Sequence, residues 1–360
     1  MKNGKYSLSG YITRLAILLA LVIVLQIFGS YIRIGTVNLS LVLIPVVLGA
    51  VLLVFTINYF NDSRPALTIL GTSATPEKIA QVEAELGLDR PYFVQLGEYL
   101  WNIITKFDFG ESYSYGVPCT SLIADRFPIT AALGLLGVCI SVVVGVALGI
   151  LAAVKQYTVL DYGSTLLATV FSAVPNFWLA MMLMLCFCVK LRWLPVTGMD
   201  TWKGWILPLV SISVGPISMF LRMTRSSILE VIRQDYVRTA RAKGLPERRV
   251  ISHHVIKNGM IPVATVIGIF VGMSMTGTIM IEKIFNISGL GLLMYGAIQA
   301  SDYTLLQGCV IVCAIIISAM TLITDIAYAF IDPRIRAQYT SGNKKKKKAE
   351  QKNAEEEKAA

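Results

Sequence analysis

Long apolar runs dominate the chain and are separated by shorter polar segments. Seven of these runs approach or exceed the ~20 residues that a helix needs to cross the hydrocarbon core of a bilayer. They cover residues 14–31, 39–59, 128–154, 166–189, 205–224, 262–280 and 305–331. The pattern predicts an all-α polytopic membrane protein with six core transmembrane helices and one uncertain additional helix at the N-terminus.

The composition agrees with this fold class, because 55% of the 360 residues are hydrophobic and only 15% are charged. The net charge of +10 comes from basic residues beside the apolar runs and in the C-terminal tail. We therefore interpret the charge as a sign of membrane topology and lipid contact, and we expect no nucleic-acid partner.

One polar segment, residues 222–257, lies between two of the apolar runs. It holds nine basic residues against three acidic ones, and a Lys/Arg excess beside membrane spans marks the cytoplasmic side. With six core helices in total, counting back from this loop also places the residues before 39 in the cytoplasm, in agreement with Lys2, Lys5 and Arg14. Residues 14–31 then either lie in the interface, form a re-entrant segment, or span the membrane against the charge rule.

The order of residues within this loop predicts two short helices. Residues 226–242 contain no Gly or Pro and place apolar side chains along one stripe, which favours a helix. Gly244 stands where a helix commonly ends, and Pro246 stands where the next one begins. A second helix from Glu247 would carry Val250 and Val255 on one face.

The same loop carries a family resemblance. Its residues 235–245 run Asp-Tyr-Val-Arg-Thr-Ala-Arg-Ala-Lys-Gly-Leu, followed by His254, Asn258 and Ile261-Pro262. This stretch resembles the ATPase-coupling loop of ABC importer permeases, specifically the B-type subunit of the oligopeptide/dipeptide/nickel branch. The resemblance implies that six residues serve the coupling: Ala240 and Gly244 for close approach and the turn, Leu245 and Val250 as apolar contacts, and Arg241 and Arg248 at the polar rim.

The resemblance also implies a function. We expect a multi-pass permease subunit of the bacterial cell membrane that takes up di- or oligopeptides by alternating access. Its expected partners are a second permease subunit in a heterodimer, cytoplasmic ABC ATPase subunits and an extracytoplasmic substrate-binding protein. A nickel complex or another small solute is the alternative substrate.

The predicted domain organisation follows the apolar runs. Residues 1–38 form an atypical segment, of which 11–50 weakly resemble a substrate-binding subunit of energy-coupling-factor transporters. Residues 39–60 form the first core helix and 61–127 an extracytoplasmic helical segment. The permease domain covers 128–332 and contains the coupling loop at 226–258, and residues 333–360 form a disordered charged tail.

Three residues are candidates for the translocation path. Pro175 and Asn176 interrupt an apolar run, and such a break either lines a cavity or is a simple kink. Asp325 is an acid within the last apolar run, where pairing with a basic residue is the competing role. For Glu282, near the end of another run, an interfacial charge paired with Lys283 or water is favoured over substrate contact.

The chain shows no sign of chemistry of its own. It has no Gly-x-x-x-x-Gly-Lys-Ser/Thr phosphate loop, no nucleophile with a base, and no ligand set for a metal. We expect no enzyme activity, no catalytic residue, no metal and no cofactor. Two other hypotheses stay open: an ATP-independent secondary transporter, which would need more charges within its spans, and an inactive fusion product with an altered N-terminus.

Overall fold

The structure is a computed structural model, which describes residues 43–60, 65–70 and 75–331. The described chain is helical apart from its turns and loops, and a single isolated β-bridge joins Glu111 to Pro118. The predictions for residues 1–38, including the additional helix at 14–31, and for the tail at 333–360 lie outside the described residues.

Several of the described helices are long and apolar enough to cross a membrane. There are four such segments among the described residues, and a bent pair of helices can form a fifth. The four segments are α6 (Cys119–Val154), α9 (Trp202–Ile232), α15 (Tyr303–Ile331) and a composite of α11 (Glu247–Arg249), η2 (Val250–Ile256) and α12 (Lys257–Ser274). The apolar helix α2 (Leu43–Phe60) stands where the first core helix was predicted.

The fifth span is the bent pair. Helix α7 (Val159–Ala173) is followed by α8 (Asn176–Leu183) and η1 (Met184–Lys190), with a bend of 96° between the two halves. The bend falls at Pro175, because a proline pushes the residue before it out of the helical region, and Val174 has φ −85° and ψ 120°. The predicted interruption at Pro175 and Asn176 is therefore confirmed.

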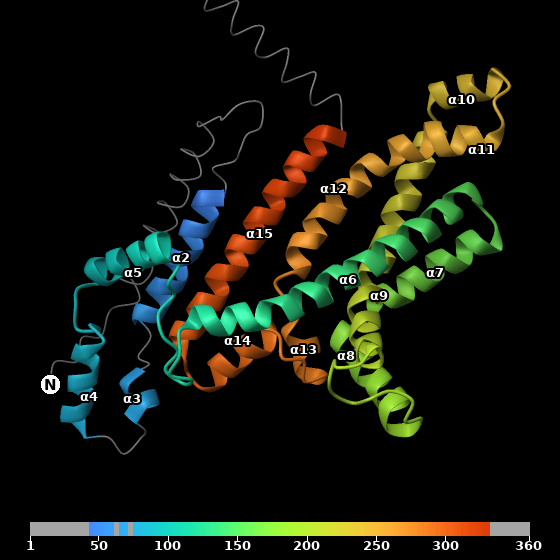
Figure 1. The fold of residues 1–360 in the computed structure, drawn as a ribbon. Helices are drawn as coiled ribbons and strands as arrows, with labels where there is room; N and C mark the ends of the chain where they lie inside the picture. Colours follow the sequence, from blue (N-terminus) through green and yellow to red (C-terminus); the bar gives the residue numbers. More distant parts are fainter. Residues whose placement is uncertain (1–42, 61–64, 71–74, 332–360) are drawn as a thin grey trace, which may run out of the picture.

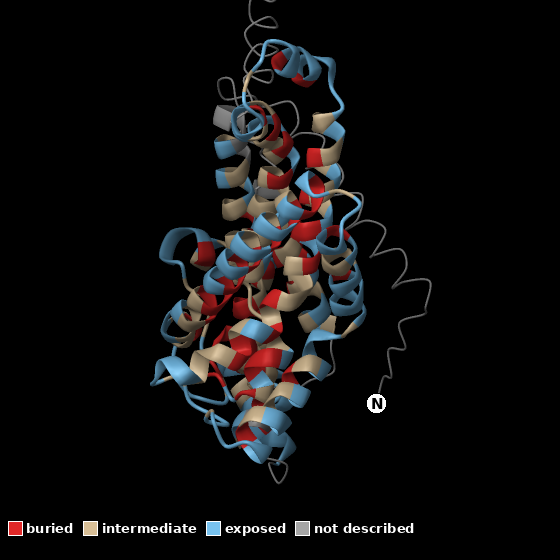
Figure 2. Cartoon of the chain, turned by 90° about the vertical axis from the view of Figure 1, so that its right-hand side faces the viewer, coloured by how far each residue is buried: buried red, intermediate tan, exposed pale blue. Residues whose placement is uncertain are grey.

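Helices α6 and α9 pack together closely, because glycines on α6 let the backbones approach. A Cβ atom at Gly145 would lie 2.8 Å from the Ile217 carbonyl oxygen, and one at Gly149 would lie 2.7 Å from the Leu221 carbonyl oxygen. Figure 2 shows buried residues where helices face one another and exposed residues on the outside. Many of the exposed residues are large and apolar, as expected for helices that face lipid.

Two groups of shorter helices lie at opposite ends of the long ones (Figure 1). We call the part formed by α10 (Asp235–Ala242), α11 and η2 the loop end. Helices α13 (Ile279–Ile284) and α14 (Leu290–Gln299) lie away from it, at what we call the opposite end. The segment between α2 and α6 contains α3 (Pro65–Leu70), α4 (Pro76–Glu85) and α5 (Tyr92–Lys106), which agrees with the predicted helical character of residues 61–127.

Two predicted boundaries are corrected by the structure. Helix α6 begins at Cys119 instead of Pro128, since Asp125 and Arg126 interrupt the apolar run without interrupting the helix. The predicted helix 226–242 is broken, because α9 ends at Ile232 and α10 begins at Asp235. The extended Gln234 between them allows α10 to turn its apolar side back toward α9.

Candidate functional site

The loop end is a small folded unit with an apolar core of its own. Its core contains Val237 and Ala240 of α10, Val250 and Val255 of η2, Ile228 of α9 and Ala153 of α6. Five of these side chains belong to residues of the predicted loop 226–258, and the sixth comes from the end of α6. The loop is therefore held on the ends of two long helices and has a defined shape.

Gly244 forms the turn between α10 and α11. Its φ of +76° lies in the left-handed region, where most side chains are strained, and its N–H donates to the Arg241 carbonyl oxygen at 2.9 Å. Pro246 then precedes α11, and its carbonyl oxygen accepts from the Arg249 N–H at 2.8 Å. The predicted helix end at Gly244 and restart at Pro246 both match this geometry.

The outer face of the loop is polar and basic. The Arg241 guanidinium donates twice to the Glu247 carboxylate, with Nε–Oε2 at 3.1 Å and Nη2–Oε1 at 2.7 Å, and so braces the turn from outside. Leu245 is half-buried and Arg248 is exposed. The exposed basic side chains of the loop end and the start of α12 are Arg238, Arg241, Lys243, Arg248, Arg249 and Lys257.

The six predicted coupling residues thus fall into two groups. Arg241, Gly244, Leu245 and Arg248 lie at or near the outer surface, where another protein could contact them. The side chains of Ala240 and Val250 instead point into the loop's own core, so Val250 is not available as an outward apolar contact. The sequence predicted Val250 as an outward apolar contact because a helical stripe shows which residues share a face, but it does not show what that face packs against.

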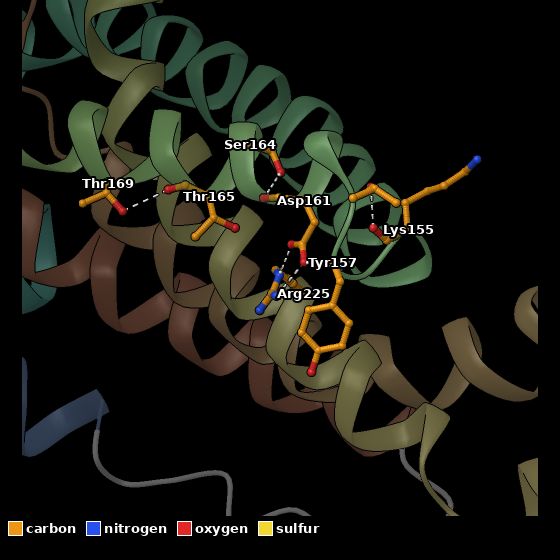
Figure 3. Close-up of polar contacts among 8 residues, drawn as sticks. Lys155, Tyr157, Asp161, Ser164, Thr165, Thr169 and Arg225 are labelled. Carbon is orange, nitrogen blue, oxygen red and sulfur yellow. Dashed lines mark hydrogen bonds and ion pairs between the residues drawn. The ribbon is translucent and has the colours of Figure 1, made fainter.

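Helix α9, which leads into the loop, is joined to α7 by a bidentate ion pair (Figure 3). Arg225 Nε lies 2.5 Å from Asp161 Oδ1, and Arg225 Nη2 lies 2.9 Å from Asp161 Oδ2. Asp161 is 1% exposed, and its Oδ2 also accepts from the Tyr157 N–H at 3.0 Å. No local sequence pattern links Asp161 to a partner 64 residues away.

A cavity of about 430 Å³ lies among α6, α8, α9, α12 and the segment before α13. Its lining includes Thr130, Asn176, Ile212, Phe270, Met273 and Thr278. Asn176 therefore faces open space beside the bend that Pro175 imposes. Asp325 belongs to α15, but its side chain lies outside the described part of the structure, so its predicted role is untested.

Glu282 differs from the expectation for it. It is fully buried, accepts from Thr130 Oγ1 at 3.0 Å and from the Leu292 N–H at 2.9 Å, and so caps the N-terminus of α14. Burial raises the pKa of its carboxyl, although these hydrogen bonds act in the opposite direction. Lys283 does not pair with it; its Nζ lies 3.6 Å from the centre of the Tyr295 ring.

The fold and the loop end define a polytopic membrane subunit that presents a folded basic loop at one end. Residues 145–337 match the family described as "binding-protein-dependent transport system inner membrane component", and residues 33–134 match the N-terminal region of such components. The chain belongs to this family of ABC importer permeases. Because the second match begins at residue 33, it includes the predicted first core helix and the predicted extracytoplasmic segment 61–127.

Known proteins agree with this membership. The chain is 39% identical over 301 residues to a protein of Brucella abortus named as a peptide transport system permease, covering 81% of this chain and 96% of that protein. It is 38% identical over 294 residues to a glutathione transport system permease of Salmonella choleraesuis, covering 82% and 96%. A chain of the MetNI methionine ABC transporter, solved facing inward, has a TM-score of 0.51 at 15% identity, covering 59% of this chain and 97% of that one, which shows a shared fold.

Membership in the family fixes several general properties. The chain is a multi-pass inner-membrane transport subunit, and it is not an enzyme, because ATP hydrolysis resides in separate subunits. The family implies ATPase subunits, a substrate-binding protein and a second permease subunit as partners.

Proposed function

We propose that this chain is the permease subunit of an importer that takes up di- or oligopeptides by alternating access. The observation that supports the peptide substrate is the match along 96% of the Brucella relative, whose name specifies peptide transport. The Salmonella relative is named for glutathione, which is itself a tripeptide. The second permease subunit would be a similar but distinct chain, so that the two form a heterodimer.

In this proposal, the loop end is the cytoplasmic seat of an ATPase subunit. Its outer face offers exposed cations around a rigid turn, while its inner face is fixed to α6 and α9. When a loop built in this way is displaced, it moves the long helices without being deformed itself, which is the requirement for rigid-body coupling. Gly244, Arg241 and Arg248 would lie against the ATPase surface.

The cavity beside Asn176 is the proposed part of the substrate path on this subunit. Asn176, the first residue of α8 after the 96° bend, lines it, so movement of α8 relative to α6 and α9 would change its shape. Its lining mixes apolar side chains with the hydroxyls of Thr130 and Thr278 and the amide of Asn176. Such a surface suits a peptide, whose backbone is polar and whose side chains vary.

The test is uptake of radiolabelled trialanine by cells that carry Gly244→Asp in place of the native chain. We expect uptake to be abolished while the amount of chain in the membrane is unchanged, because the variant adds a charge to the turn and strains it. Gly244→Asn is the matched control: asparagine adopts positive φ more readily and is uncharged, so it should retain most uptake. Normal uptake by Gly244→Asp would contradict the coupling role, and uptake that persists without the chain would contradict the peptide substrate.

A further inference from the structure

Most residues of helix α7 are exposed in the described structure. Only Asp161 and Ala168 are buried among its 15 residues. A mostly apolar cavity of about 310 Å³ separates part of it from α6 and α9, with Leu167 on one side and Leu221 on the other. In a membrane, lipid is as apolar as leucine, so apolar surface alone provides little force to hold α7 against α9.

Two polar contacts bridge this gap. The first is the ion pair of Asp161 with Arg225, and the second is the Arg222 guanidinium, which donates to Ser172 Oγ at 2.6 Å and to the Ala168 carbonyl oxygen at 3.3 Å. Arg222 and Arg225 are one helical turn apart on α9, while Asp161 and Ser172 lie near opposite ends of α7. We call these four residues the α7–α9 clamp.

The clamp stands between the loop end and the cavity. Arg225 lies on α9 ten residues before the loop end begins at Asp235, and α7 runs from the clamp to the bend at Pro175, beyond which Asn176 lines the cavity. We propose that the clamp transmits movement of the coupling loop to the cavity wall by making α7 and α9 move as one rigid body. This inference rests on the proposed function, and Asp161 is a positioning residue in it.

The bidentate geometry suits this role. Two parallel hydrogen bonds fix the direction of the guanidinium as well as its distance from the carboxylate. Asp161 is also held from its own side by the Tyr157 N–H, so the carboxylate cannot turn to follow Arg225. A displacement of α9 must therefore displace α7 or break the pair.

The experiment measures distances between spin labels in the complex purified through a tag on this chain, with exposed Cys139 and Cys186 replaced by serine. One label pair joins Leu166 of α7 to Ser226 of α9, and a second joins Leu166 to Thr321 of α15, all exposed positions. Each pair is measured without nucleotide and after trapping with ATP and vanadate. For the parent chain, we expect the α7–α9 distance to stay constant while the α7–α15 distance changes.

Asp161→Asn should break this pattern, so that trapping changes or broadens the α7–α9 distance and leaves α7 closer to its resting distance from α15. Arg225→Lys keeps a charged contact but loses the bidentate fork, and it should give an intermediate result if Asp161→Asn does not assemble. Glu98→Gln is the matched control, since it removes an ion pair with Arg90 that is half exposed and far from the clamp. It should behave as the parent.

The outcomes separate the two proposals. If the complex assembles and α7 moves relative to α15, but both clamp variants match the parent, the clamp proposal is wrong and the importer proposal stands. If no ATPase subunit copurifies with the parent chain, or if trapping changes neither distance, the proposed function fails and this inference fails with it. A role in folding alone would lower the yield of complex without changing the α7–α9 distance on trapping, which would also overturn the clamp.

Discussion

The two ends of the molecule use carboxylates in opposite ways. At the opposite end, Glu282 and Asp302 are fully buried and accept hydrogen bonds from backbone N–H groups and hydroxyls, including those of Leu292 and Ser112. At the loop end, Glu247 is exposed and its partner is the flexible, exposed side chain of Arg241. The opposite end is stabilised by buried hydrogen bonds, whereas the turn at the loop end is stabilised by an exposed ion pair.

This difference indicates that the opposite end is a rigid frame and that the loop end is a surface for contact with another protein. Glu282 joins three elements, since Thr130 of α6 donates to it while its own helix α13 and the N-terminus of α14 surround it. Asp302 similarly joins the segment before α6 to the start of α15. The loop end places its apolar side chains inside and leaves its basic face uncovered, as a surface that meets another protein requires.

The largest effect should come from removing the buried carboxylate. Glu282→Leu leaves the Leu292 N–H and the Thr130 hydroxyl without their acceptor, and we expect it to lower the free energy of unfolding by about 3 kcal/mol. A thiol-reactive dye that reports exposure of buried Cys119, Cys188 and Cys309 during heating in detergent measures this change. Glu282→Gln, which keeps an acceptor oxygen, should lose less. Equal stability of the parent, Glu282→Leu and Glu282→Gln would contradict the proposed difference between the two ends.

The pH dependence of the free energy of unfolding should also reflect the buried carboxylate of the opposite end. Burial raises the pKa of Glu282 above its ordinary 4.5, so near that pH the folded chain holds a proton that the unfolded chain has released. The contribution of Glu282 to stability is therefore complete below pH 4.5 and is lost as the pH rises through the folded-state pKa. The slope should be at most about 1.4 kcal/mol per pH unit. Unfolding followed at several pH values should show this slope in the parent and its loss in Glu282→Gln, and an unchanged slope would contradict the assignment.

The smallest effect should come from the exposed ion pair. Arg241→Ala and Glu247→Ala should each lower the free energy of unfolding by less than about 1 kcal/mol, because water and salt screen exposed charges. A double-mutant cycle with the same dye assay gives the energy of the pair. A coupling larger than that of the Glu282 site would reverse the comparison between the two ends.

Local features were predictable from the sequence, and long-range pairs were not. Gly244 and Pro246 marked the turn because few residues adopt their backbone conformations, and Pro175 marked the bend for a similar reason. The contact between Thr130 and Glu282 joins positions 152 residues apart, and no spacing along the chain indicates it. Glu282 was expected at an interface because an acid beside an apolar run is usually solvated. The fold buries it by supplying donors from two other helices.

Which side chains of the loop end are buried and which are exposed was predictable only in part. The apolar faces that carry Ala240 and Val250 on two predicted helices were visible in the sequence, whereas the packing of α10 against Ile228 of α9 depends on the break at Gln234. No Gly or Pro in residues 226–242 indicates that break. Arg241 and Arg248 are exposed, as expected of charges that are costly to bury, and their contact with an ATPase stays a prediction.

The most direct test of the account is amide hydrogen exchange on the complex purified through this chain, before and after the ATPase subunits are removed. We predict that residues 235–256 exchange more slowly when the ATPase subunits are present, while α14 exchanges equally in both samples. That result would place the ATPase on the loop end and leave the opposite end as the frame. Equal exchange of residues 235–256 in the two samples, or purification of the chain without any ATPase subunit, would contradict the account.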